Sequence, residues 1–247
     1  VWKSLVYNLP HKVAKFLMNS VIDTLNTNAN LCRWGKKISD KCKHCDNKET
    51  LHHVLNSCQT ALQGGRFTWR HDNLLHYLID LIHRGIKDTE AQIFGDLDNT
   101  IFTKKGISTI PHECTQTNLH PDICVLWKSL RKMLIFELSV PFELNIDKMH
   151  DYKSQKYTPL QTDLEENGYD VTLICLEIGS RGFVSQGNEA RLKQLISLID
   201  RPDTFKKVRN SLSKLATISS FVIYSAKNEP SWDVKAPLQI PRDTLLP

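Results

Sequence analysis

The 247-residue sequence has no long hydrophobic run, no internal repeat and no low-complexity stretch. Because spanning a bilayer takes about 18 consecutive apolar residues, the sequence predicts no transmembrane helix and no membrane partner. It begins at Val1 without a charged and then apolar leader, which predicts a piece of a longer polypeptide without a signal peptide. Seven cysteines, an odd number, lack the spacing of a disulfide framework and favour a reducing compartment.

The composition is that of an ordinary globular protein, with 40% hydrophobic and 24% charged residues. A chain of this length forms one large domain or two small ones and buries enough surface for a core. The net charge of +5 and the pI of about 8.8 fit a polyanionic partner without requiring one. The sequence carries no polymerase signature, since the acids of "FGDLDN" (94–99) are not the paired aspartates of a polymerase turn.

Hydrophobic periodicity predicts helices in the first third of the chain. Apolar residues recur at intervals of three and four over 5–25, and again from Leu74 to Ile82. Residues 26–30 have the composition of a turn, and residues 95–120 predict a loop with a short strand at 100–102.

After residue 120, short apolar runs replace the helical periodicity. The predicted elements are a β-hairpin of 121–127 and 132–140, a helix over 145–167 that Pro159 can kink, a strand over 169–179, a helical stretch over 188–215 broken at Arg201-Pro202, and an extended tail from 228. The predicted fold class is therefore α+β, with a small mixed sheet flanked by helices and preceded by a helical segment.

A metal-binding motif lies between the two parts, Cys42-x2-Cys45-x7-His53-x4-Cys58. A Cys-x2-Cys turn directs two thiolates at one point, and a His and a Cys one helical turn apart supply two more zinc ligands. His44 or His52 is an alternative nitrogen ligand, but His53 is better placed for the helical face of Cys58. Four protein ligands leave no open position, so the sequence predicts a structural Zn²⁺.

Two acids follow in the predicted hairpin. Asp122 stands at the start of its first strand, and Glu137 lies within the second, in "LIFEL". A buried carboxylate needs a cation, a proton or a metal beside it. Two acids on adjacent strands with a nearby lysine suit phosphodiester hydrolysis with Mg²⁺ or Mn²⁺. The alternative is that Glu137 pairs structurally with a lysine and that Asp122 caps a turn.

The next predicted helix carries the lysines. His150, Lys153 and Tyr157 share one helical face, whereas Lys156 lies about 100° from Tyr157. Either lysine can serve the acids, and we favour Lys153 because of the face that it shares with Tyr157.

Taken together and in this order, several segments resemble the C-terminal region of non-LTR retrotransposons that carry a restriction-like endonuclease of the PD-(D/E)xK type. The segments are "DTLNTNANLCRWGKK" (23–37), the CCHC motif, "TWRHDNLLHYL" (68–78), "HPDICVLW" (120–127), "LIFELSVPFE" (134–143), "HDYKSQKYTPL" (150–160) and "LEIGSRGFV" (176–184). The resemblance covers most of the chain and implies a restriction-endonuclease-like sheet behind a zinc knuckle.

The resemblance also implies roles for individual residues. Those with implied catalytic roles are Asp122, Glu137, Lys153, Lys156 and Tyr157, with Asp122 and Glu137 as Mg²⁺ ligands. Ser139 occupies the position of the motif's lysine, so the lysine has to come from the following helix. Contacts to DNA are implied for Arg70, His71 and Arg181, and an accessory acid for Glu143. A surface helix start at 70–72, a plain turn at Arg181 and a solvated Glu143 are the alternatives.

The domain organisation follows the same resemblance. It predicts a helical linker after a reverse-transcriptase thumb over 1–40, the zinc knuckle and a helix over 41–95, the endonuclease domain over 96–227 and the tail over 228–247. The implied function is a metal-dependent DNA endonuclease in the nucleus, whose nick in target DNA primes reverse transcription. Its implied partners are target DNA, the rest of the retrotransposon polyprotein and, as a further candidate, the element RNA. Two other hypotheses are an inactive nucleic-acid-binding remnant and a zinc-stapled interaction domain.

Overall fold

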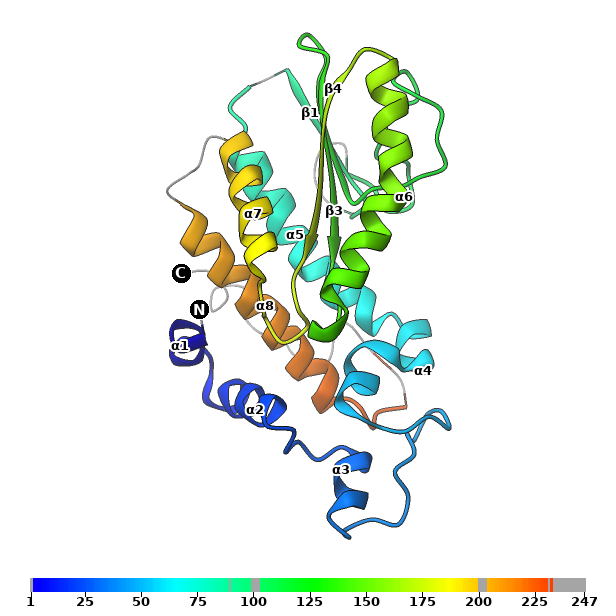
Figure 1. Ribbon diagram of the computed structural model, residues 1–247, viewed down its shortest axis with the longest axis vertical. Helices are drawn as coiled ribbons and strands as arrows, with labels where there is room; N and C mark the ends of the chain where they lie inside the picture. The colour runs from blue at the N-terminus through cyan, green and yellow to red at the C-terminus, as the bar shows by residue number, and fades with distance from the viewer. Residues whose placement is uncertain (1, 89, 99–102, 200–203, 231, 233–247) are drawn as a thin grey trace.

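The computed structural model of the chain describes residues 2–88, 90–98, 103–199, 204–230 and 232. Helices cover both faces of a central sheet, and a smaller group of helices lies beneath it (Figure 1). This arrangement confirms the predicted α+β class with a mixed sheet. Within the described part, none of the helices has both the length and the hydropathy required to span a membrane.

The sheet has four strands in the order β1 (Ala91–Gly95), β2 (Ile123–Trp127), β3 (Lys132–Ser139) and β4 (Asp170–Glu177). β1, β2 and β3 are antiparallel neighbours, whereas β3 and β4 run parallel. The β2–β3 hairpin and β4 confirm the strands predicted after residue 120. In the parallel pair, Glu137 lies beside Cys175, and Ser139 beside Glu177.

Alternate residues of β3 enter two different cores, as the two-residue period of a strand requires. Leu134, Phe136 and Leu138 pack with α5 (Arg66–Gly85), α7 (Gln186–Leu198) and α8 (Phe205–Ser225) on one face. Met133 and Ile135 pack with α6 (Ile146–Glu166) on the other face (Figure 1). Glu137 therefore belongs to the face that α6 covers.

Two predictions for the N-terminal part are wrong in detail. The helix predicted over 5–25 is divided into α1 (Trp2–Tyr7) and α2 (His11–Val21), because Pro10 starts a new helix. The turn predicted at 26–30 is largely α3 (Asn28–Arg33), since the side chain of Thr27 accepts a hydrogen bond from Asn30 N and caps the helix.

The remaining elements follow the predictions more closely. α6 continues through Pro159, and α8 extends to Ser225, ten residues beyond the predicted helical stretch. The periodicity missed β1. The predicted strand at 100–102, the break at Arg201-Pro202 and most of the tail lie outside the described residues.

The helix α5 ties the central segment of the chain to the sheet. Leu74, Leu75, Leu78 and Ile82 are fully buried and belong to the same core as β2, β3 and β4. β1 also precedes residue 96 and is an edge strand of the sheet. α5 and β1 thus share a core with the other strands of the sheet.

Candidate metal centre and acidic centre

The first two cysteines of the CCHC motif lie on a tight hairpin. Lys41 and Lys48 form an antiparallel bridge, and Cys42 N donates to Asn47 O at 2.8 Å. The thiol sulfurs also accept from the turn, because His44 N lies 3.5 Å from Cys42 Sγ. The hairpin directs both thiol groups toward the segment that carries the other two ligands.

His53 and Cys58 reach the same point through a π-helical turn, η1 (His53–Ser57), which the short α4 (Gln59–Gln63) follows. Cys58 N donates to His53 O at 2.9 Å, an i to i+5 hydrogen bond that matches the five-residue step between the two ligands. The sequence predicts an ordinary helical turn here, but an α-turn closes over four residues and would misalign the two side chains.

The four side chains, here called the Cys3His cluster, fit a tetrahedral zinc ion. Cys42 Sγ lies 4.0 Å from Cys58 Sγ, and Cys45 Sγ lies 3.4 Å from His53 Nε2. All four ligand atoms lie within 4.8 Å of one another. Zn–S bonds of about 2.3 Å and Zn–N bonds of about 2.0 Å place tetrahedral ligands roughly 3.5–3.8 Å apart. The donor set is therefore that of structural zinc.

The alternative nitrogen ligands are occupied elsewhere. His44 Nε2 lies 3.0 Å from Lys227 O, and His52 Nε2 lies 3.2 Å from Ser57 Oγ. Neither belongs to the cluster, so the structure favours His53.

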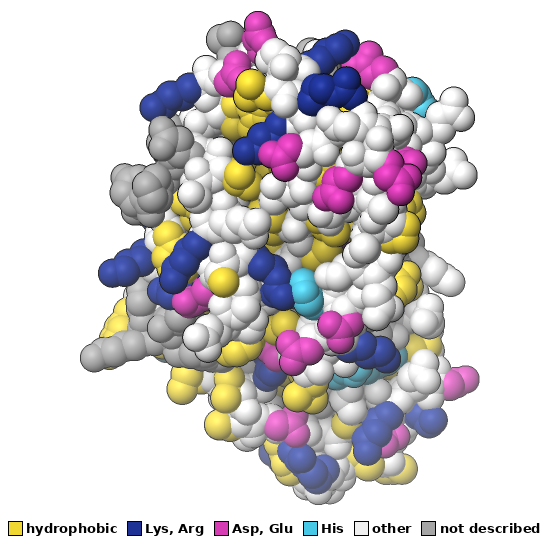
Figure 2. Space-filling model, turned by 45° about the horizontal axis from the view of Figure 1, so that its top comes forward, with side chains coloured by type: hydrophobic (Ala, Val, Ile, Leu, Met, Phe, Trp, Pro, Cys, Tyr) yellow, Lys and Arg dark blue, Asp and Glu magenta, His cyan; other side chains and the backbone are white. Residues whose placement is uncertain are grey.

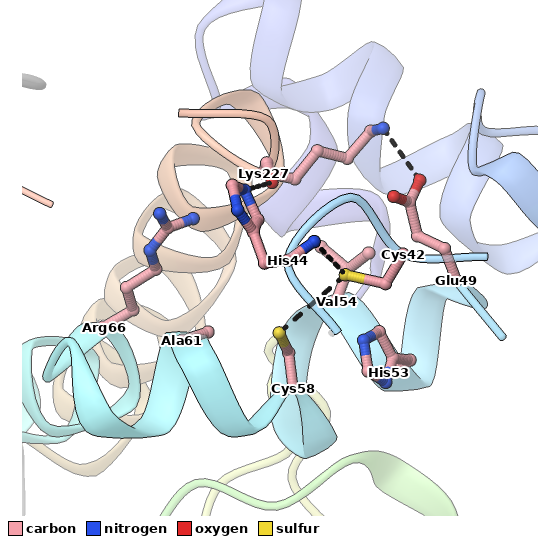
Figure 3. Close-up of a pocket in the computed structure, with 9 residues that line it drawn as sticks. All are labelled: Cys42, His44, Glu49, His53, Val54, Cys58, Ala61, Arg66 and Lys227. Atoms are coloured by element: carbon pink, nitrogen blue, oxygen red, sulfur yellow. Dashed lines mark hydrogen bonds and ion pairs between the residues drawn. The ribbon is translucent and has the colours of Figure 1, made fainter. Parts of the chain in front are cut away.

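The Cys3His cluster lies against the C-terminal end of α8 (Figure 3). Arg66 Nη1 donates to Ala226 O at 2.8 Å, where a helix end leaves carbonyl groups free. Lys227 Nζ forms an ion pair with Glu49 at 2.8 Å, and Glu49 also accepts from Asn28 N at 2.9 Å. Glu49 is 1% exposed, so this buried pair connects α3, the hairpin and α8.

The second centre combines the two predicted acids and is called the acidic centre below. Asp122, directly before β2, and Glu137, near the end of β3, are both buried. Asp122 N donates to Glu137 Oε2 at 3.2 Å, and Asp122 Oδ2 accepts from Leu138 N at 2.6 Å. The antiparallel register of β2 and β3 thus brings two carboxylates together at one end of the strand pair.

Of the two candidate lysines, Lys153 contacts the acids. Lys153 Nζ forms an ion pair with Glu137 Oε1. Burial and the charge of Asp122 raise the pKa of Glu137, while Lys153 acts in the opposite direction. Burial lowers the pKa of Lys153, but the carboxylates of Glu137 and Asp122 outweigh it and leave the pKa raised. Lys153 and Glu137 are therefore held together by a direct contact within the protein.

Lys156 contacts Tyr157, whose hydroxyl in turn interacts with Glu137 of the acidic centre. Lys156 Nζ donates to Tyr157 OH at 3.1 Å, and Tyr157 OH donates to His120 O at 3.1 Å. Tyr157 is fully buried, and its hydroxyl anchors α6 to the chain just before Asp122. Burial raises the pKa of Tyr157 far above its ordinary value, so the hydroxyl stays protonated.

His71 lies beside the acidic centre rather than on an open surface. Its Nε2 is 3.2 Å from Asp122 Oδ2, and its Nδ1 is 3.2 Å from Asp72 Oδ1. Asp72 in turn pairs with Lys105. Burial lowers the pKa of His71, but Asp122 and Asp72 outweigh it and raise the pKa to about 10. The protonated ring can donate to both carboxylates and fix Asp122.

This charge state predicts a pH dependence of stability. Because the pKa of His71 is raised on folding, its contribution is complete below about pH 6.5 and is lost as the pH rises through about 10. The shift corresponds to at most about 4–5 kcal/mol. Partial exposure to solvent reduces the expected contribution to roughly 2 kcal/mol. Urea unfolding without added divalent metal should show the wild type losing that much more stability over this range than His71→Gln.

His76→Gln is the matched control for this measurement. His76 lies on the same helix and pairs with Asp80 at its surface, at 3.3 Å. Parallel pH profiles for the wild type and His71→Gln would contradict the proposed charge of His71.

The other residues with implied DNA contacts bond within the protein. Arg70 is 1% exposed and donates to Val140 O and Ser220 Oγ at 3.0 Å each. In this structure Arg70 therefore has no surface with which to contact DNA. Arg181 forms an ion pair with Glu143 at 2.7 Å, and both side chains are largely buried. Glu143, the implied accessory acid, and Arg181 are therefore paired with each other within the protein.

Sequence reasoning missed a third acid beside the centre, Glu177 at the end of β4. Its side chain is 1% exposed, and its Oε1 lies 3.2 Å from His150 Nδ1. Arg191 Nη1 lies 3.6 Å from the other oxygen, and burial raises the pKa of Glu177 to about 7. An acid after an apolar run, as in "LIFEL", also occurs in "LICLEIG" (173–179), and this pattern could have identified it.

A comparison with protein families bears on the N-terminal part. Residues 1–64 match the family model described as zinc-binding in reverse transcriptase. The match contains all four members of the Cys3His cluster. It relates this segment to reverse transcriptases, as expected for part of a retrotransposon polyprotein, and supports zinc as the ion. Among curated proteins, no match to the chain was found.

Proposed function

We propose that the chain is the zinc-knuckle and endonuclease part of a retrotransposon polyprotein, and that its acidic centre nicks DNA in a metal-dependent reaction. The observation that carries the proposal is the meeting of Asp122, Glu137 and Lys153 at one end of a mixed sheet. Asp122 directly precedes β2, Glu137 lies in β3 and Lys153 in α6, which is the arrangement that the resemblance implies. The reverse-transcriptase match of the N-terminal segment supports the same context.

The donor set of the acidic centre fits Mg²⁺ or Mn²⁺. Both ions prefer oxygen ligands, and the carboxylates of Asp122 and Glu137 would hold them. A bound ion would polarise the phosphodiester and lower the pKa of the attacking water. Burial and the charge of Asp122 raise the pKa of Glu137, so a cation beside the two carboxylates would favour their charged forms.

The chain's own groups would hold and balance charge around the reaction. Lys153, now paired with Glu137, would neutralise charge that develops on the phosphate. His71 would keep Asp122 oriented through its Nε2–H. The hydrogen bond from Tyr157 OH to His120 O would fix the position of α6, and with it Lys153, relative to the start of β2.

Nicking of supercoiled plasmid by the wild-type chain, with Mg²⁺, Mn²⁺ or neither, tests the proposal. We expect nicked circles only with metal, and none from Glu137→Ala under the same conditions. Glu166→Ala, at the exposed end of α6, is the control and should nick as the wild type does. DNA binding that weakens with salt but no nicking by the wild type would favour the inactive remnant. Absence of both would favour an interaction domain.

The two lysines make separate predictions. Lys153→Met should lower the nicking rate by about 100-fold, because the charge beside Glu137 is lost. Lys156→Met should lower it by less than about 10-fold, because Lys156 contacts the ring and hydroxyl of Tyr157 rather than the acids. Single-turnover nicking at saturating protein measures both rates. A larger loss for Lys156→Met would reverse this assignment.

A further inference from the structure

The connection between α3 and the knuckle hairpin is unusually open. Seven consecutive residues, 33–39, are exposed, and they include a tryptophan. Trp34 is 37% exposed, and Ile38 is fully exposed. A tryptophan usually buries its large apolar ring, as Trp127 does with 8% exposure. An exposed ring on a short loop is available for stacking with the planar ring of a ligand.

Two cations lie against the ring of Trp34. Arg33 Cζ is 5.9 Å and Lys36 Nζ 5.8 Å from the ring centroid. Gly35, with φ of +68°, makes the left-handed turn that brings Lys36 back beside the ring, and no other atom lies within 4 Å of its Cβ position. The loop therefore presents an exposed aromatic ring with two cations over it, of which Arg33 also forms an exposed ion pair with Asp23 at 3.2 Å.

Positive charge is concentrated in this part of the chain. Residues 33–48 contain six basic residues and two acidic ones, a net charge of +4 of the chain's +5. The basic residues are Arg33, Lys36, Lys37, Lys41, Lys43 and Lys48. On the face in Figure 2, by contrast, basic and acidic side chains are interspersed. The coincidence of excess charge with an exposed ring distinguishes the loop.

We propose that the loop 33–39 binds single-stranded nucleic acid, with one base stacked on Trp34 and neighbouring phosphates held by Arg33 and Lys36. Exposed aromatic rings with cations beside them bind single strands because every base has a flat face and every linkage a negative charge. A duplex keeps its base faces stacked and offers Trp34 only its backbone. α3 lies at the bottom of the molecule, below the sheet (Figure 1), so this surface goes beyond the proposed endonuclease centre.

Fluorescence anisotropy with labelled 20-nucleotide probes tests this inference on the full chain. The probes are oligo(dT), oligo(U) and a mixed-sequence DNA duplex, each titrated at two salt concentrations. Trp34→Ala should weaken binding of the single strands by about 10-fold, with a much smaller effect on the duplex. Trp34→Phe keeps a stacking ring and should stay within about 3-fold of the wild type. Tyr7→Ala, at an aromatic residue of α1 that is 79% exposed, is the matched control.

The outcomes separate this surface from the acidic centre. A loss confined to oligo(U) or oligo(dT) would still support the surface and would identify the polymer that it prefers. Wild-type affinity of Trp34→Ala for both single strands, or an equal loss for Tyr7→Ala, would overturn the inference. Trp34→Ala should nick plasmid at the wild-type rate. The binding assay does not depend on nicking, so its result can be interpreted even if the wild type does not nick DNA. Circular dichroism confirms that each variant is folded.

Discussion

Cys58→Ser is expected to release the bound zinc and to destabilise the N-terminal half of the chain. Cys58 is 5% exposed, and its thiol lies 4.0 Å from that of Cys42. A serine hydroxyl binds zinc poorly, so the remaining three ligands cannot close the tetrahedron. Because a structural ion contributes directly to folding, the free energy of unfolding should fall by roughly 3 kcal/mol or more.

Metal analysis and hydrogen exchange measure this effect. Zinc content should fall from about one ion per chain to nearly none, and exchange should rise over residues 40–60 and at the end of α8, where Glu49 and Lys227 pair. Cys32→Ser changes a cysteine outside the cluster and should keep its zinc. Full zinc content in Cys58→Ser would exclude this ligand set.

Removal of the first acid should abolish nicking while it spares DNA binding. Asp122→Ala deletes one proposed metal ligand and the acceptor of both Leu138 N and His71 Nε2. We expect a loss of at least about 1000-fold in the nicking rate, about 4 kcal/mol of transition-state stabilisation. DNA affinity should change less than about 3-fold, because the phosphate contacts that dominate binding lie on basic side chains.

A second variant separates charge from packing. Asp122→Asn retains an acceptor for Leu138 N, so it should fold as the wild type does and still fail to nick. Asp170→Ala, at an exposed acid on the opposite end of β4, controls for the loss of a negative charge. Nicking by Asp122→Asn at the wild-type rate would contradict the proposed role of Asp122 as a metal ligand.

The Cys3His cluster could be predicted from the sequence because the spacing of its four residues is short. The predicted hairpin placed Asp122 and Glu137 on adjacent strands, and the resemblance implied a lysine from the following helix. Lys153 could be preferred because it shares a helical face with Tyr157, and that face turns toward β3. The partners of His71 and Glu177 could not be predicted. Asp122 lies 51 residues from His71, and Arg191 reaches Glu177 from a separate helix, so only the tertiary fold brings them together.

The prediction of helices and strands was limited in a similar way, because it depended on a visible hydrophobic pattern. The strands that follow residue 120 have short apolar runs bounded by polar turns, and these strands were predicted. β1 has only five residues with mixed burial, so neither period is visible in it. α3 was missed because turn-forming residues such as Asn28 also cap and begin helices, as Thr27 does here. The π-turn at His53 depends on ligand geometry that no hydrophobic pattern reports.

The packing of α5 limits how this chain can be divided or exchanged in evolution and in the laboratory. A fragment that starts at residue 96 would lack α5 and β1, and would expose Phe136 and its neighbours on one face of the sheet. Such a surface promotes self-association. The zinc-binding segment also contacts the chain just after β3, because Asn56 Nδ2 donates a hydrogen bond to Val140 O at 2.9 Å. A functional swap between related elements therefore has to transfer the knuckle and the sheet as one inherited unit.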